Sequence, residues 1–172
     1  MFPMISRLEE WYEAKAIVDS VRKELPPVDI QLGIMIEVPS AAVLADLFAA
    51  EVDFFSVGTN DLTQYTLSID RMHPLLSGKA DGLDPAVLRL IKMTVDAAHA
   101  HGKWVGICGE LGADAKAIPI LTGLGVDELS VTVPAVAPTK SAVRDLTLSQ
   151  ARNLARQALN SASAQAVRQL KI

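Results

Sequence analysis

The sequence is poor in the residue types that several classes of protein require. It has one cysteine in 172 residues, so no disulfide can form within one chain, and this suits a reducing cytoplasm. One cysteine and three scattered histidines also argue against a structural zinc site. Aromatic residues make up 5% of the chain, which argues against a surface that stacks nucleic-acid bases.

Excess positive charge and long apolar runs are also missing. The formal net charge of −4 provides no general attraction to nucleic acid or to anionic membrane surfaces. The first ten residues contain no apolar run long enough for a secretory signal. The apolar stretch 32–55 contains four acidic residues, so it does not read as a membrane span. We therefore expect a protein without a nucleic-acid partner and without membrane insertion.

What the chain does have is a normal globular composition, with 50% apolar and 21% charged residues, arranged in a repeating pattern. Short apolar runs alternate with amphipathic helical stretches, and the runs are apolar on both sides, which is typical of a parallel sheet covered by helices. The expected strands are residues 1–5, 31–37, 53–58, 103–108 and 127–133. The expected helices are residues 6–25, 39–50, 84–102, 114–125 and 149–170.

Several predicted helix ends carry recognisable signals. Ser6 and Glu9 fit a capping box, in which the two side chains satisfy each other's backbone N–H groups. Asp84 is a good N-cap, and Gly102 suits the end of the same helix. Asp114 is expected to cap the helix that follows it.

The number of strands leaves two architectures open. A closed eight-unit barrel takes roughly 250 residues, whereas this chain holds about five predicted strands in 172 residues. It is therefore either a small doubly wound sheet or the latter part of a (β/α)8 TIM-type barrel that is incomplete in this chain. Because the sequence starts inside an apparent strand, it favours the partial barrel. We assign residues 1–148 to this partial barrel and residues 149–172 to a C-terminal helix packed on it.

Polar groups follow three of the strands at the point where each strand ends. Glu37 follows the second strand, Asn60 and Asp61 follow the third, and Cys108 ends the fourth. In both architectures ligands bind at the carboxyl ends of the strands, so we expect these groups to converge on one cleft. Glu37 and Asp61, together with substrate oxygens and water, would suit Mg²⁺. Each carboxylate could instead simply stabilise a helix N-terminus.

Two more polar residues belong to the same segment. The planar guanidinium of Arg71 suits a phosphate or carboxylate, although for the residue considered alone an ion pair with Asp70 or another surface acid is the better explanation. Asn60 could donate a hydrogen bond to a phosphate oxygen, or could only complete the turn after Gly58.

Cys108 lies between glycines in the stretch "GICGE", residues 106–110. Small neighbours let another molecule approach the backbone closely. A free thiol is mostly protonated at neutral pH, and no histidine or aspartate is near in sequence to activate a nucleophile. A proton donor therefore fits Cys108 better than a nucleophile. The alternative is a cysteine that serves only as a small buried apolar residue.

Taken together, four stretches resemble the C-terminal part of enzyme I, the phosphoenolpyruvate–protein phosphotransferase of the bacterial sugar phosphotransferase system. The resemblance covers nearly the whole chain to about Ser130 and continues more weakly to the end. It includes the variant in which enzyme I is fused into a multiphosphoryl transfer protein. Pyruvate phosphate dikinase and phosphoenolpyruvate synthase are related, but "DLTQYTLSIDR" looks closer to enzyme I. The four stretches are residues 33–42, 51–71, 84–114 and 121–131.

The resemblance implies a (β/α)8 barrel that binds phosphoenolpyruvate and Mg²⁺. It implies that Glu37 and Asp61 are the Mg²⁺ ligands, and that Asn60, Asp61 and Arg71 contact phosphoenolpyruvate. Cys108 matches the residue that protonates the enolate to give pyruvate. These are the strand-end groups that the sequence pattern had already indicated.

The resemblance also implies partners. Phosphate would move to a histidine in a separate N-terminal domain and then to a phosphocarrier protein, with pyruvate released during sugar uptake. No segment of this chain resembles the phosphohistidine domain, and the family's first barrel strands, with two further substrate-binding arginines, are absent. Family members are usually homodimers through this domain, so a homodimer is implied as well.

Two other interpretations are compatible with the residues. An incomplete barrel exposes edges that invite dimerisation, so the chain could be a non-catalytic assembly piece of the same family. It could also be another pyruvate- or phosphoenolpyruvate-utilising enzyme, such as a dikinase, a synthase or an acid lyase with a similar Mg²⁺ pair. An acid lyase would not be expected to need the cysteine at position 108.

Overall fold

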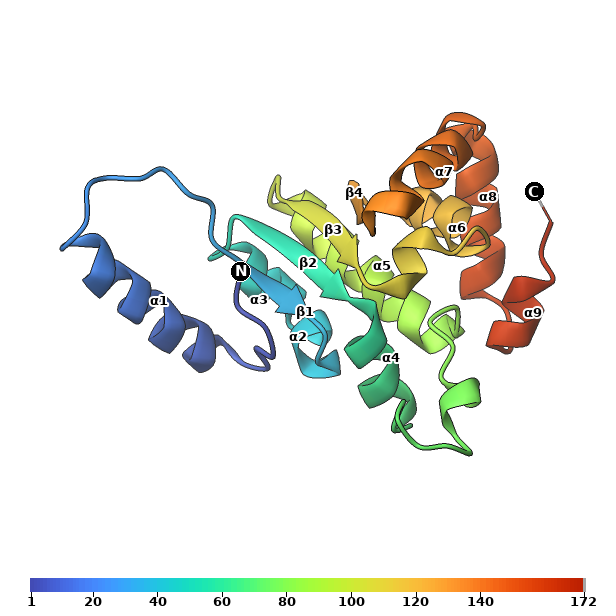
Figure 1. Ribbon diagram of the computed structural model, residues 1–172, viewed down its shortest axis with the longest axis horizontal. Helices are drawn as coiled ribbons and strands as arrows, with labels where there is room; N and C mark the ends of the chain where they lie inside the picture. The colour runs from blue at the N-terminus through green and yellow to red at the C-terminus, as the bar shows by residue number, and fades with distance from the viewer. Residues whose placement is uncertain (172) are drawn as a thin grey trace.

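A parallel sheet whose strands follow one another in chain order forms the centre of the computed structural model, which describes residues 1–171 (Figure 1). The sheet order is β1-β2-β3-β4, so each strand pairs with the next one along the chain. A doubly wound sheet would show a reversal of strand order, whereas consecutive pairing is the order of a (β/α)8 barrel. The predicted α/β class is confirmed, and the strand order favours the partial barrel. The strands are β1 (Gly33–Ile36), β2 (Phe54–Gly58), β3 (Trp104–Cys108) and β4 (Glu128–Ser130).

Helices and two short 3-10 turns connect the strands. The long helix α5, between β2 and β3, packs against both of these strands. No helix among residues 1–171 is long and apolar enough to cross a membrane. The helices are α1 (Leu8–Arg22), α2 (Pro39–Val43), α3 (Ala45–Ala49), α4 (Thr59–Leu67), α5 (Pro85–Ala100), α6 (Ala117–Leu124), α7 (Val133–Arg144), α8 (Leu148–Leu159) and α9 (Ala164–Arg168), and the 3-10 turns are Ser77–Lys79 and Glu110–Ala113.

The first of the five predicted strands is reduced to a single pairing. Phe2 forms an isolated parallel bridge with Ile34. Pro3 has no N–H to donate to a ladder, and Met4 has a φ of 57°, so the chain turns away from the sheet after one residue. The sheet therefore has four strands and one bridge rather than five strands.

The two faces of the sheet differ in chemistry. One face is fully buried and apolar, and forms the main core together with α5. The other face carries the stacked aromatic rings of Phe54 and Trp104 at the start of β2 and β3, with ring centroids 4.5 Å apart. Small or polar residues follow toward the carboxyl ends of these strands, which are Ser56, Gly58, Gly106 and Cys108. The expectation that the strands are apolar on both sides thus holds for the buried face and for the start of β2 and β3 on the other face, but not for their carboxyl ends. The apolar face consists of Ile34, Ile36, Phe55, Val57, Val105 and Ile107, each 0% exposed.

The predicted caps are partly correct. Asp84 caps α5 through a hydrogen bond from the N–H of Ala86, and Gly102 follows the helix with a φ of 68°. At α1, however, Ser6 is held by Glu10 rather than by Glu9, since the N–H of Ser6 donates to Glu10 Oε2 at 2.7 Å.

Three helix boundaries also differ from expectation. Helix α1 ends at Arg22, three residues before the predicted end. The predicted helix 39–50 is broken at Leu44, whose φ of −97° and ψ of 17° are not helical, and it becomes α2 and α3. Helix α6 begins at Ala117, one turn after Asp114, whose side chain accepts the N–H of Lys116.

The C-terminal part contains three helices where one was expected. The predicted helix 149–170 consists of α8 and α9, and Ser163 caps the second by accepting the N–H of Ala166. Helix α7 was not predicted, because its sequence contains Pro134 and Pro138. Pro134 lies in the first turn, where a missing N–H costs nothing, whereas Pro138 lies inside the helix and removes a backbone hydrogen bond there.

Helix α8 packs closely on α6, and Gly123 is the residue that allows it. A Cβ atom at Gly123 would lie 2.0 Å from the carbonyl oxygen of Ala151. We therefore predict that Gly123→Ala lowers the free energy of unfolding by about 2–3 kcal/mol, because two helix backbones must separate.

Urea denaturation of the variant would measure this loss. Gly78→Ala is the matched control, since a Cβ there meets nothing within 4 Å. Equal stability of the two variants would contradict the tight packing of α8 on α6.

Candidate active site

The register of the sheet places the strand-end residues in one row. Gly58 of β2 pairs with Cys108 of β3, and Cys108 pairs with Ser130 of β4. On the other side Ile36 pairs with Val57, so the next residue, Glu37, follows at the level of Gly58. The carboxyl ends of β1, β2 and β3 thus bring Glu37, Gly58 and Cys108 next to one another, at the edge where parallel α/β proteins bind ligands.

Glu37 is a buried carboxylate, with 4% of the residue exposed. Its Oε1 atom accepts a hydrogen bond of 2.7 Å from the N–H of Met4. Its Oε2 atom lies against Gly58, where a Cβ would come within 2.8 Å of it. Glycine at position 58 therefore leaves the room that this carboxylate occupies. The hydrogen bond explains how one oxygen of a buried acid is satisfied and leaves Oε2 for another ligand.

Asn60 and Asp61 belong to the first turn of α4, which begins directly where β2 ends. Negative charge is favoured at this end of a helix. Arg71 lies after α4, and its Nη2 is 3.3 Å from Asp61 Oδ1, with both side chains partly exposed. The ion pair of Arg71 is therefore with Asp61, whereas Asp70 accepts the N–H of Met72.

The thiol of Cys108 is held by two groups of the neighbouring strand. The hydroxyl of Ser56 donates to Sγ at 3.3 Å, and the thiol donates to the carbonyl oxygen of Val57 at 3.4 Å. Ser56 is 6% exposed, and Cys108 is partly exposed. The contacts orient the sulfur without any acidic or basic side chain among its hydrogen-bond partners in residues 1–171. Ser56 was missed by the sequence analysis, because only strand register reveals that it lies beside the cysteine.

Gly109, which follows β3, lies against the start of α4. Its φ is 114°, and a Cβ there would lie 2.6 Å from Thr59 Oγ1 and 3.4 Å from Asn60 Oδ1. The hydroxyl of Thr59 donates to the carbonyl oxygen of Cys108 at 3.2 Å. Glycine is thus needed here both for its backbone conformation and for the close approach. Cys108 and Asn60 consequently lie on two segments that touch.

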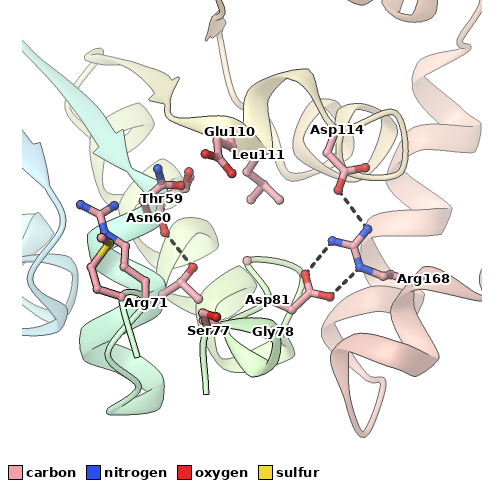
Figure 2. A pocket seen from close by; sticks show the side chains of 14 residues that line it. Thr59, Asn60, Arg71, Ser77, Gly78, Asp81, Glu110, Leu111, Asp114 and Arg168 are labelled. Carbon is pink, nitrogen blue, oxygen red and sulfur yellow. Dashed lines mark hydrogen bonds and ion pairs between the residues drawn. The ribbon is translucent and has the colours of Figure 1, made fainter. Parts of the chain in front are cut away.

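A cleft of about 670 Å³ opens beside this row (Figure 2). Asn60 and Arg71 line it, but Glu37, Asp61 and Cys108 do not. The predicted residues therefore fall into two groups, one in the cleft wall and one along the strand ends. They are connected through Asp61, which neighbours Asn60 and pairs with Arg71. The other lining residues are Thr59, Thr63, Met72, Ser77, Gly78, Ala80, Asp81, Gly82, Glu110, Leu111, Asp114 and Arg168.

An ion-pair cluster closes the far side of the cleft, and no sequence pattern indicated it. Arg168 of α9 donates from Nε to Asp81 Oδ2 at 2.5 Å and from Nη2 to Asp81 Oδ1 at 2.8 Å. Its Nη1 donates to Asp114 Oδ2 at 2.9 Å. Figure 2 shows the guanidinium between the two carboxylates. Asp81 and Asp114 are 87 and 54 residues away from Arg168 in sequence, so only the fold brings them together.

The cluster perturbs the ionisation of its members. Burial raises the pKa of Asp81, but the hydrogen bonds from Arg168 and from the N–H of Leu83 lower it more, so the pKa lies below its usual value. The hydrogen bond to Asp81 is the main cause that raises the pKa of Arg168. The pKa of Asp81 is lower in the folded protein than in the unfolded chain, where it is near 4. The ion pair therefore stabilises the fold at neutral pH, and this stabilisation is lost as the pH falls below about 4 and through the lowered pKa.

The carboxylates at the strand ends fit some metal ions and exclude others. No group of three or more His, Cys, Asp or Glu side chains among residues 1–171 could hold a metal. A zinc site with a closed set of protein ligands therefore does not fit these residues. Mg²⁺ does fit, because it binds through one or two carboxylates and takes its other oxygens from substrate and water. Glu37 Oε2 and Asp61 Oδ2 accept no hydrogen bond within the described residues.

Comparisons with known proteins show the family of the chain. The family model for the phosphoenolpyruvate-binding domain of phosphoenolpyruvate-utilising enzymes matches residues 1–148. A multiphosphoryl transfer protein of Rhodobacter capsulatus is 53% identical over 99% of this chain and 21% of its own length. Phosphoenolpyruvate-protein phosphotransferases of Enterococcus faecalis and Staphylococcus carnosus are 49% and 44% identical, over 92% and 97% of this chain. The chain covers 29% and 30% of these two proteins, so it spans less than a third of each relative.

One solved structure supports the fold alone. A citrate lyase of Burkholderia xenovorans superposes with a TM-score of 0.64 at 20% identity, over 81% of this chain and 47% of that one. At this identity the likeness does not bear on the acid-lyase interpretation.

The family model matches residues 1–148, and relatives of the same family are 44–53% identical over nearly the whole chain. The chain belongs to the family of phosphoenolpyruvate-utilising enzymes, as their phosphoenolpyruvate-binding domain.

Proposed function

We propose that this chain is the phosphoenolpyruvate-binding catalytic segment of a phosphoenolpyruvate–protein phosphotransferase. Phosphate would pass from phosphoenolpyruvate to a histidine of another domain and then to a phosphocarrier protein, leaving pyruvate. The observation that carries this proposal is the row of Glu37, Gly58 and Cys108 at the strand ends, next to a cleft lined by Asn60 and Arg71. The names of the relatives support the reaction class.

Arg71 is the cation of the cleft wall that suits a phosphate group. The cleft is lined by two arginines, and Arg168 already faces the carboxylates of Asp81 and Asp114. Arg71 has one carboxylate contact, at 3.3 Å, and its remaining N–H groups are able to donate to a ligand. Asn60 adds a side-chain amide at the N-terminus of α4, which is a favourable place for an anion.

Glu37 and Asp61 would hold Mg²⁺. When bound, the metal supplies positive charge that stabilises phosphate and enolate oxygens. The protein's contribution is the pair of carboxylates on successive strand ends, one fixed by the N–H of Met4 and the other by Arg71.

Cys108 is assigned to proton transfer. Its S–H would protonate the methylene carbon of the enolate, so that an S–H bond breaks, a C–H bond forms and a thiolate remains. The hydroxyl of Ser56, 3.3 Å from Sγ, would donate to that thiolate and stabilise it. The carbonyl oxygen of Val57 holds the thiol hydrogen before the transfer.

Helix α1 bears on how this chain would associate with a second copy of itself. Helix α1 stands away from the sheet (Figure 1), and it exposes the apolar side chains of Tyr12, Ile17 and Val21, with Ile17 67% exposed. Exposed apolar side chains on a protruding helix support a homodimer, and they also favour the alternative of a dimerisation or assembly piece. We propose a cytoplasmic homodimer that works with a phosphohistidine domain and a phosphocarrier protein.

Binding of phosphoenolpyruvate by this chain should depend on Mg²⁺. We predict that calorimetric titration detects binding that is at least about tenfold weaker without the metal, since the metal shares the phosphate charge. Asp61→Asn should remove this metal dependence, because it removes a metal ligand. Arg71→Lys should weaken binding by roughly tenfold, because a lysine lacks the planar fork.

Arg152→Gln serves as the control for these variants, because Arg152 is exposed on α8 and does not line the cleft. Absence of any binding by the unaltered chain would contradict a usable site built from these residues alone.

The proposed role of Cys108 has to be tested in a protein that carries out the whole reaction. The chain can replace the matching segment of the Rhodobacter capsulatus relative, to which it is 53% identical. In this chimaera, Cys108→Ala should slow pyruvate formation from phosphoenolpyruvate by about a hundredfold or more, the usual worth of a general acid. Phosphoenolpyruvate affinity should change little, because the variant keeps the cleft residues Asn60 and Arg71 that are proposed to bind the phosphate. An unchanged rate would remove the proton-donor assignment.

Ser56→Ala in the same chimaera tests whether the Ser56 hydroxyl stabilises the thiolate of Cys108. Losing one hydrogen bond to a developing thiolate should slow pyruvate formation roughly tenfold and shift its pH dependence to higher pH. Ser56→Thr keeps the hydroxyl and should retain most of the activity. If Ser56→Ala and the parent have the same pH profile, the serine does not act on the cysteine.

A further inference from the structure

The loop between α4 and α5, residues 68–84, carries cleft residues at both of its ends. Arg71 lies near its start and Asp81 near its end. Hydrogen bonds inside the loop form the 3-10 turn Ser77–Lys79, and the N–H of Arg71 donates to Gln64 of α4. Among residues 1–171, the hydrogen bonds that join this loop to any segment beyond α5 all come from Arg168. Within the described residues, Arg168 therefore supplies the hydrogen bonds that tie the far end of the loop to the C-terminal part of the chain, while Leu83 anchors the same end by burial in the main core.

Arg168 is presented rigidly. It is the last residue of α9, a helix capped by Ser163. The preceding residue, Val167, is 1% exposed and belongs to the main core. The backbone that carries the guanidinium is thus fixed by packing on the rest of the molecule. Because the backbone of Arg168 is held in place, its planar guanidinium can fix the position of the carboxylates that it binds.

Both carboxylates are fixed on their own segments too. Asp81 Oδ1 also accepts the N–H of Leu83, a residue that is 0% exposed. Asp114 Oδ1 accepts the N–H of Lys116, where the chain leads into α6. Arg168 consequently connects three segments, namely the loop, the approach to α6 and the C-terminal helix α9. The lowered pKa of Asp81 agrees with a contact that remains intact at neutral pH.

We propose that Arg168 is a positioning residue of the active site, which fastens the loop 68–84 and thereby holds Arg71 in the wall of the cleft. It acts from outside residues 1–148, the part that the family model matches. The effect of Arg168 on phosphoenolpyruvate binding rests on the proposed function. The contact between Arg168 and the loop does not depend on that function.

The first measurement tests the loop without any ligand. Hydrogen–deuterium exchange of the chain should show amides 70–83 exchanging about tenfold faster in Arg168→Gln, because the fastened end is released. Asp81→Asn should give a similar increase, since the amide oxygen still accepts the N–H of Leu83 but the charge is lost. Arg168→Lys should restore part of the protection. Arg152→Gln, an exposed arginine of the same C-terminal segment, should change nothing.

The second measurement tests the consequence for the site. Calorimetry with phosphoenolpyruvate and Mg²⁺ should show roughly three- to tenfold weaker binding by Arg168→Gln, the range expected when a partly exposed bidentate pair is lost. Arg168→Lys should be intermediate, and the double variant Arg168→Gln/Asp81→Asn should be no worse than either single variant. The urea midpoint of each variant identifies any general loss of stability, which would affect helices far from the loop equally in the exchange experiment.

The outcomes separate the two hypotheses. Unchanged exchange in the loop of Arg168→Gln would overturn the proposal, whatever the ligand affinity. Faster exchange confined to the loop, with no binding of phosphoenolpyruvate by any form, would support the fastening role and contradict the proposed function. Faster exchange with unchanged affinity would show that Arg168 holds the loop but does not position Arg71.

Discussion

The pairing of β2 with β3 is the constraint on which the site depends. Its register sets Gly58 opposite Cys108 and Ser56 opposite Gly106. A shift by one residue would turn the cysteine and the serine to the helix-covered face and bring Val57 and Ile107 to the site. The register is protected against such a shift because the apolar side chains of the opposite face are completely buried. The core therefore determines the position of the polar groups, although it does not touch them.

Three glycines make the polar edge possible. Gly58 leaves room for the carboxylate of Glu37, and Gly109 lets the end of β3 touch the start of α4. Gly106 lies opposite Ser56, on the same face of the sheet as Cys108. In a complete barrel the inner face is commonly filled with bulky apolar residues. The glycines on this face instead give room to neighbouring side chains, since Met35 and Glu37 lie against Gly58 and the ring of Trp104 lies against Gly106.

The sequence alone allowed the fold class and the places of the strand-end residues to be predicted, because both follow from local patterns. Alternating apolar and amphipathic stretches indicated the parallel sheet, and strand ends are easily located in such a pattern. Helix α7 escaped prediction because its prolines are ordinarily helix breakers, and only its packing on α6 compensates for them. Ser56 escaped because its importance comes from its neighbour on another strand. The roles of Glu37, Asn60, Asp61, Arg71 and Cys108 stay predictions, since position alone does not establish chemistry.

The placement of Arg168 has a consequence for how this protein can be divided and controlled. The family match ends at residue 148, yet a wall of the cleft is completed by a side chain twenty residues further on. The residues that line the cleft therefore extend beyond the segment that the family model matches. A second domain, a light-sensitive module or a crosslink attached next to α9 would therefore change the cleft through Arg168, without altering the residues on its opposite wall. Natural insertions at the same place would offer evolution an equally direct way to adjust substrate affinity without altering any residue that contacts the substrate.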